Sequence, residues 1–75
     1  MLKADGFDEA ILGTVHQAGG TDLLCYSSAK VIEILVTRDG MSPCEAMEYF
    51  DFNIAGAYMG SGTPVFLDDI FEADL

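Results

Sequence analysis

A helix that begins at Ser42 is the sequence feature that most constrains the fold of this chain. Serine is a preferred N-cap, Pro43 stands at the first helical position, and Glu45 completes a capping box three residues after the cap. Apolar residues then recur at spacings of three and four, which predicts a helix from 43 to about 56. Its expected core face consists of Pro43, Met47, Phe50, Ile54 and Ala57.

A second helix is predicted over 28–39. Ser27 is its expected N-cap and Asp39-Gly40 its expected stop. Four apolar residues fall on one side of the helical wheel: Val31, Ile32, Leu35 and Val36. The run 31–36 is β-branched enough to form a strand instead, but its length and the two end signals favour the helix.

The rest of the chain predicts one more helix and two strands. Apolar spacing after Asp5 indicates a first helix at about 7–18, ended by Gly19-Gly20. The apolar run 22–26 is typical of a strand. The segment 63–67 predicts a last strand at a sheet edge, because Pro64 has no N–H to donate to a ladder.

These elements predict a small α+β fold with the order α-β-α-α-β and a two-stranded sheet packed on helices. The chain has 75 residues, of which 51% are hydrophobic, so one thin core is expected despite the charge. Residues 1–75 therefore form a single small acidic domain. Residues 68–75 form an acidic tail, either mobile or held on the body by Ile70 and Phe71.

Negative charge is concentrated in the second half of the chain. Residues 1–38 carry five acids and three bases, a net −2, whereas 39–75 carry eight acids and no base, a net −8, which together give −10. Such a field repels phosphate backbones and anionic membranes and attracts basic surfaces. Nucleic acid and membranes are therefore excluded as direct partners, and a basic protein surface is favoured.

The cysteines and the N-terminus predict a cytoplasmic protein. Cys25 and Cys44 allow at most one disulfide, whereas a secreted domain of this size usually carries more. The first residues lack the apolar run of a signal peptide, and no apolar stretch approaches the roughly 20 residues of a membrane span.

The candidate chemical groups do not predict an enzyme, a cofactor or a metal site. His16 is the sole histidine, and no nucleophile is placed beside it by the sequence. Cys44 stands in the first turn of a helix, which lowers a thiol pKa, but two neighbouring glutamates oppose a thiolate. Glu45, Glu48 and Asp51 step along one helix and are interpreted as a solvated acidic face.

Phe52 is the most informative single residue for function. It points almost opposite the expected core face of its helix, among acids, which is typical of an aromatic anchor for a partner. The alternative is that another element, such as the C-terminal tail, covers it. The predicted partner-binding residues are Glu45, Glu48, Tyr49, Phe52, Asp68, Asp69, Glu72 and Asp74.

Short motifs are spread over residues 10–67: Ala10 to Gly13, Tyr26 to Leu35, Gly40-Met41-Ser42, Glu45-Ala46, Glu48 to Asn53, Gly56-Ala57-Tyr58, Gly60, Thr63-Pro64 and Phe66. Together they resemble a family of short uncharacterised proteins encoded by phages and some bacteria. The chain departs from the pattern at Met59 and Ser61 and in its long acidic tail. The resemblance implies a phage or mobile-element origin, and with it the host cytoplasm, and brings no catalytic residues.

Charge, size and resemblance together favour an acidic protein-binding module. Its concrete form is an inhibitor that acts as a nucleic-acid mimic on a host defence protein, such as a CRISPR or restriction component. The alternative is a self-associating structural or regulatory protein that forms a homodimer through the second helix or Phe52. An enzyme is the least favoured of the three classes.

Overall fold

The structure is a computed structural model that describes residues 2–56, 60 and 62–69. A short 3-10 helix, η1 (Asp8–Ala10), precedes strands β1 (Ile11–Val15) and β2 (Leu23–Ser27). Helices α1 (Ser28–Asp39) and α2 (Pro43–Tyr49) follow, and α2 continues into a π-helix, η2 (Phe50–Ala55). Strand β3 (Val65–Leu67) ends the described part of the chain.

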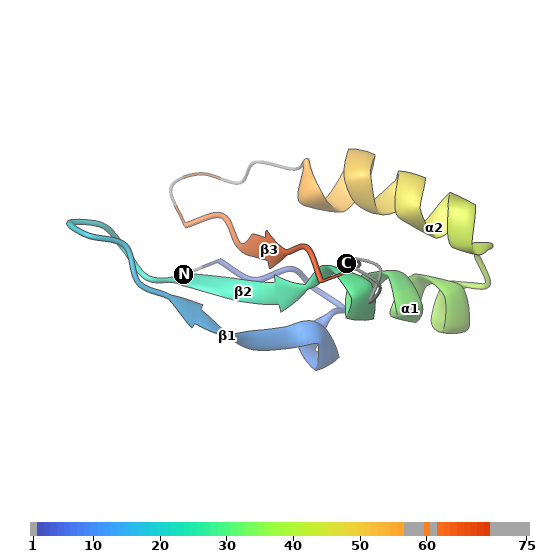
Figure 1. The fold of residues 1–75 in the computed structure, drawn as a ribbon, viewed down its shortest axis with the longest axis horizontal. Helices are drawn as coiled ribbons and strands as arrows, with labels where there is room; N and C mark the ends of the chain where they lie inside the picture. The colour runs from blue at the N-terminus through green and yellow to red at the C-terminus, as the bar shows by residue number, and fades with distance from the viewer. Residues whose placement is uncertain (1, 57–59, 61, 70–75) are drawn as a thin grey trace, which may run out of the picture.

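The sheet has three strands in the order β1-β2-β3 and is mixed. β1 and β2 form an antiparallel hairpin, whereas β2 and β3 pair in parallel, with Tyr26 opposite Phe66. Parallel pairing needs a long crossover, and α1 with α2 supplies it (Figure 1). The α+β class is thus confirmed, but the prediction of a two-stranded sheet was wrong.

The predicted first helix at 7–18 was wrong, because its middle part, residues 11–15, forms β1. Ile11, Thr14 and Val15 are β-branched, and pairing with β2 satisfies their backbone groups. The ladder shifts register between Ile11 and Gly13, so this glycine marks a bulge rather than a weak helical position. Gly19-Gly20 form the hairpin turn instead of a helix end, with Gly20 N–H donating to the Gln17 carbonyl at 3.1 Å.

Helix α1 begins and ends as predicted. The Ser27 hydroxyl accepts from the Lys30 N–H at 3.0 Å, and Gly40 closes the helix in the left-handed conformation with φ 72°. Val31 and Leu35 are fully buried against the sheet and the N-terminal segment. The alternative of a strand at 31–36 is therefore ruled out.

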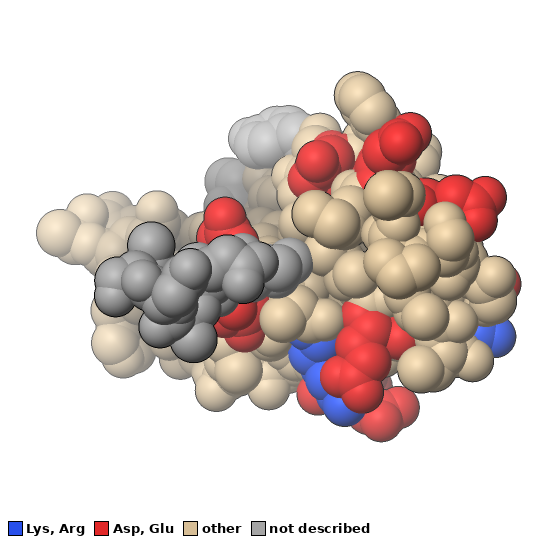
Figure 2. Space-filling view, turned by 45° about the vertical axis from the view of Figure 1, so that its right-hand side comes forward, with Lys and Arg blue, Asp and Glu red and all other residues tan. Residues whose placement is uncertain are grey.

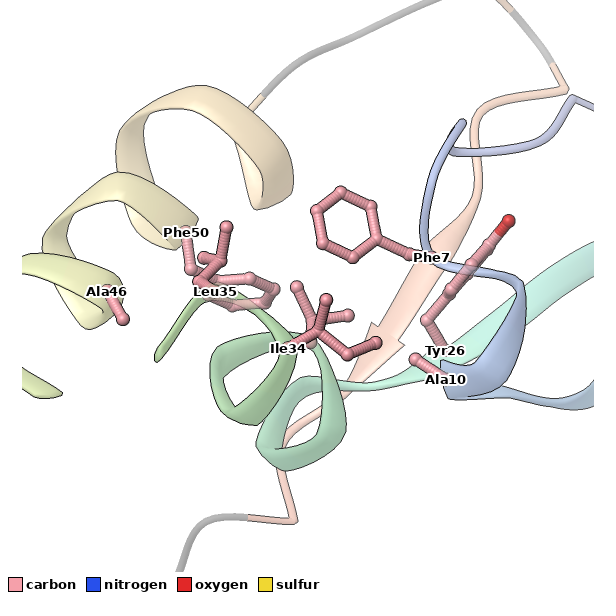
Figure 3. Packing of buried hydrophobic residues seen from close by; sticks show 8 residues of the cluster. Phe7, Ala10, Tyr26, Ile34, Leu35, Ala46 and Phe50 are labelled. Carbon is pink, nitrogen blue, oxygen red and sulfur yellow. The ribbon is translucent and has the colours of Figure 1, made fainter. Parts of the chain in front are cut away.

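Helix α2 begins as predicted but buries a different face. Ala46 is 0% exposed and Phe50 7%, whereas Met47 is 47% exposed. The buried row is therefore Ala46, Phe50 and the partly buried Ile54, spaced by four residues. The small Ala46 side chain lets α2 approach α1 closely, which turns Met47 away from the core (Figure 3).

Aromatic rings join the two halves of the core. Phe66 of β3 packs edge-on against Phe50, with ring centroids 5.3 Å apart, and lies 5.5 Å from the ring of Tyr26. Tyr26 is fully buried, and its hydroxyl accepts from the Ala4 N–H at 2.8 Å. Phe7 packs into the same cluster from the N-terminal segment (Figure 3). This cluster fixes η2 against the sheet and so positions Phe52.

Candidate functional site

The capping box at the start of α2 fixes one acidic side chain in place. The Glu45 N–H donates to the Ser42 hydroxyl at 3.2 Å, and the Ser42 N–H donates to a Glu45 carboxylate oxygen at 3.0 Å. These bonds from the backbone and side chain of Ser42 lower the pKa of Glu45 below its ordinary value. Glu45 therefore presents a negative charge in a defined position at the beginning of α2.

A shallow depression of about 370 Å³ lies beside this carboxylate, and we call it the acidic hollow. Phe52 stands over it with 80% of its surface exposed, and Tyr49 is 42% exposed. The acidic hollow is lined by Met41, Glu45, Glu48, Tyr49, Phe52 and Asn53. Four of the predicted partner-binding residues are thus brought together, and Phe52 is open to solvent rather than covered.

A second depression lies on the other side of the same helix, and we call it the apolar hollow. It has a volume of about 400 Å³, and its apolar lining comes from the N-terminal segment, α1, η2 and β3. The apolar lining residues are Ala4, Phe7, Leu35, Ile54, Pro64 and Phe66, and the polar ones are Lys3, Asp5, Arg38, Asp39, Tyr49 and Asn53. Tyr49 and Asn53 therefore border both hollows.

The charged rim of the apolar hollow is held by Arg38. Its guanidinium donates to the Gly6 carbonyl at 2.7 Å and to both carboxylate oxygens of Asp39 at 2.9 and 3.1 Å. The same group lies 5.0 Å from the ring centroid of Phe7, a cation–π contact. Arg38 thus joins the end of α1 to the N-terminal segment at the border of the apolar hollow.

Sequence reasoning missed Met41 and Asn53 as members of the surface. Asn53 stands four residues after Tyr49, and helical spacing places such a pair on one face. Met41 precedes Ser42, the N-cap of α2, and its backbone N–H donates to the Leu35 carbonyl at 3.3 Å. Because Met41 directly follows Gly40, this bond belongs to the C-terminal cap of α1, and the Gly40 stop signal could have indicated the position of Met41.

Asp68 and Asp69, the two acids after β3 that the structure describes, do not line the acidic hollow. Asp68 borders a third depression together with Asp51, Met47 and Phe50. Asp69 accepts from the Ser27 hydroxyl at 2.5 Å and from the Ala29 N–H at 2.8 Å. Glu72 and Asp74 lie outside the described residues. Among the predicted acids that the structure describes, only Glu45 and Glu48 therefore border the acidic hollow.

Asp69 is a structural residue, and its removal is expected to lower stability. Its carboxylate adds a second cap to the N-terminus of α1, where the free N–H groups and the helix dipole favour negative charge. We expect Asp69→Asn to lower the free energy of unfolding by about 1 kcal/mol at neutral pH. Urea unfolding followed by circular dichroism measures this difference.

The pH dependence of that difference provides the control. The hydrogen bonds from Ser27 and Ala29 lower the pKa of Asp69, so its stabilisation is complete above the unfolded pKa and disappears as pH falls through the folded one. The gap between wild type and Asp69→Asn should therefore shrink below about pH 4. Glu48→Gln, which removes an equal charge from an exposed position, should show no such gap.

Among the residues that the structure describes, His16 and Cys44 lie far apart. His16 lies in the hairpin loop with its Nδ1 2.9 Å from a carboxylate oxygen of Asp22, and this hydrogen bond raises the pKa of His16. The exposed Cys44 lies at the start of α2, at the opposite end of the molecule (Figure 1). Among the described residues, no group of three or more His, Cys, Asp or Glu side chains is placed to hold a metal ion.

Acidic side chains dominate the face that includes the α1–α2 end of the molecule. Figure 2 shows red groups along two sides of this face, a band of uncharged atoms between them, and few blue ones. Negatively charged and uncharged groups thus lie side by side on this part of the surface.

Comparison with known proteins gives no indication of function, so the surface of the molecule is the remaining evidence. The chain matches no protein-family model, no curated protein and no solved structure. Within the described part of the chain, every helix is too short or too polar to cross a membrane.

Proposed function

We propose that this protein is a non-catalytic binding module that docks the surface around Phe52 on a basic surface of another protein. The observation that supports this most is the 80% exposure of Phe52 beside the carboxylates that line the acidic hollow. Burial of an exposed aromatic ring supplies binding energy, and flanking acids supply charge complementarity and faster association. The aromatic ring comes from η2 and the carboxylates from the adjoining α2, so both requirements of a charged interface are met along one continuous helix.

The partner of this module is a protein that normally holds nucleic acid on its basic surface. The net charge of −10 and the absence of any base after Arg38 favour a protein that competes with nucleic acid for a basic surface over a protein that binds nucleic acid itself. The resemblance to phage-encoded proteins makes the concrete form an inhibitor of a host defence protein, such as a CRISPR or restriction component. The inhibitor would occupy the site as a nucleic-acid mimic.

Affinity capture from a bacterial lysate tests this proposal with a charge reversal. We expect the immobilised protein to retain a basic protein at about 50 mM salt and to release it at about 500 mM, because screening weakens the attraction. Glu48→Lys should retain at least about tenfold less of it, since like charges repel across the interface. Quantitative mass spectrometry of the eluates gives both ratios.

The matched control reverses a charge elsewhere. Glu33 lies on α1 with its side chain 59% exposed and borders neither hollow, so Glu33→Lys makes the same change in net charge. It should retain nearly as much partner as wild type. Equal losses for Glu33→Lys and Glu48→Lys would mean that net charge alone attracts the partner and would contradict the proposed surface.

A second candidate function is self-association, and one observation favours it. The exposed Phe52 lies beside the acidic hollow, and an apolar hollow with no net charge at its rim lies on the same surface. Two copies related by a two-fold axis can each place Phe52 into the apolar hollow of the other. Sedimentation of the pure protein at micromolar concentration distinguishes the two functions, because a strict monomer excludes the homodimer.

A further inference from the structure

The two hollows form one continuous surface with two different chemistries. Tyr49 and Asn53, which are four residues apart, line both of them. Their side chains form a ridge across the α2–η2 helix, with the apolar hollow on one side and the acidic hollow on the other. A partner that crosses this ridge meets both hollows in succession.

The apolar hollow suits a large uncharged side chain. Its floor contains Phe7, Leu35 and Phe66, of which Leu35 is fully buried. At its rim, Lys3 and Arg38 are balanced by Asp5 and Asp39, so the rim carries no net charge. Burying a leucine or phenylalanine side chain there gains apolar contact without placing a charge against an opposing one.

The acidic hollow suits a cation, and specifically a guanidinium group. Glu45 is fixed by its bonds to Ser42, and Glu48 lies one helical turn further on. The exposed rings of Tyr49 and Phe52 add aromatic surface on which a planar guanidinium stacks. Carboxylates and aromatic rings together recognise arginine better than lysine.

The width of the ridge sets the spacing between the two partner residues. A helix with its side chains is about 10–12 Å across, and Tyr49 and Asn53 line both hollows, so we infer a separation of about 10 Å between an anchor and a cation on the two sides of these residues. A polyproline II segment rises about 3.1 Å per residue and returns to the same face every third residue. Residues i and i+3 of such a segment are therefore about 9 Å apart on one side, which matches the ridge.

We propose that the partner presents an extended segment with an arginine and a large apolar residue three positions apart, which bind the acidic and the apolar hollow respectively. This inference rests on the proposed function and names the recognition element of that same surface. The arginine contacts the two carboxylates of the acidic hollow, whereas the apolar residue contacts a rim with no net charge. This difference sets the direction in which the segment crosses the ridge.

Two capped peptides of identical composition test the spacing. The probe is Ala-Arg-Pro-Pro-Phe-Ala, in which the prolines hold the extended conformation, and the matched control is Ala-Arg-Phe-Pro-Pro-Ala. Titration of ¹⁵N-labelled protein at low salt should shift the amide signals of Leu35 and Ile54 as well as those of Glu48 and Phe52. The probe should bind about tenfold more tightly than the control, because only its two side chains reach both hollows together.

A variant that fills the apolar hollow tests whether this hollow causes the difference in affinity between the two peptides. Ala4 lines the apolar hollow and makes its hydrogen bond to Tyr26 through its backbone N–H, which Ala4→Leu retains. This variant should bind the two peptides equally, and its own amide spectrum shows whether it is folded. The comparison of the two peptides on the wild-type protein stands even where the variant does not fold.

Three results would overturn the inference. Equal affinity for both peptides, with shifts confined to Glu48 and Phe52, would show that the spacing has no role while leaving the acidic surface intact. If millimolar peptide shifts no amide signal at either hollow, the proposed recognition segment is refuted. The proposed function is tested separately, by affinity capture with the Glu48→Lys variant. A dimer that dissociates on Phe52→Ala and on Ala4→Leu would identify a second copy as the occupant.

Discussion

Replacing Phe50 with alanine is expected to lower the free energy of unfolding by about 3–5 kcal/mol. Phe50 is 7% exposed, and its ring packs edge-on against Phe66 at 5.3 Å, which joins η2 to β3. A domain of this size has few kcal/mol of stability in total, so the variant should be largely unfolded at 25 °C. Urea unfolding followed by circular dichroism measures the loss.

Phe52→Ala is the matched control for this prediction, because it removes the same ring two residues later. Phe52 is 80% exposed, so its truncation should change stability by no more than about 0.5 kcal/mol. The two variants thus compare a core phenylalanine with a surface phenylalanine within one turn of η2. A Phe52→Ala variant that unfolds as readily as Phe50→Ala would mean that Phe52 is part of the core.

The sequence predicted both helices around the α1–α2 crossover because their signals are local. The Ser27 cap, the Ser42 capping box and the Gly40 stop each act within four residues of the helix end. The same helical spacing indicated that Phe52 lies opposite the buried face, and the structure has it open to solvent. Local hydrogen bonds and periodicity were therefore sufficient for this half of the molecule.

The N-terminal half was predicted incorrectly because its conformation depends on distant contacts. The apolar residues of 7–18 fit a helical face, but Ile11 to Val15 gain their hydrogen bonds from β2, which lies across the hairpin. Phe7 is buried, but in a turn rather than a helix. Pattern alone cannot weigh a nonlocal strand pairing against a local helix.

The acids after β3 show the same limit at the candidate site. Asp69 was predicted to bind a partner, but its hydrogen bonds to Ser27 and Ala29 span 42 and 40 residues of sequence. No local spacing indicates such a cap. The apolar hollow also escaped prediction, because its lining comes from segments as distant as Ala4 and Phe66.

Phe52→Ala is expected to weaken binding of the captured partner by about 30-fold to 1,000-fold, which corresponds to about 2–4 kcal/mol. A central aromatic anchor loses its buried contact area on truncation, and Phe52 is the most exposed large hydrophobic residue among those that the structure describes. Its removal leaves Glu45 and Glu48 in place, so the long-range attraction remains. Isothermal titration calorimetry with the purified partner measures the affinity.

That titration is the most direct test of a binding surface centred on Phe52. The account predicts that Phe52→Ala, folded and as stable as wild type, binds at least about 30-fold more weakly, while Glu33→Lys binds nearly as tightly as wild type. Wild-type affinity for Phe52→Ala, with its circular dichroism spectrum unchanged, would contradict the account.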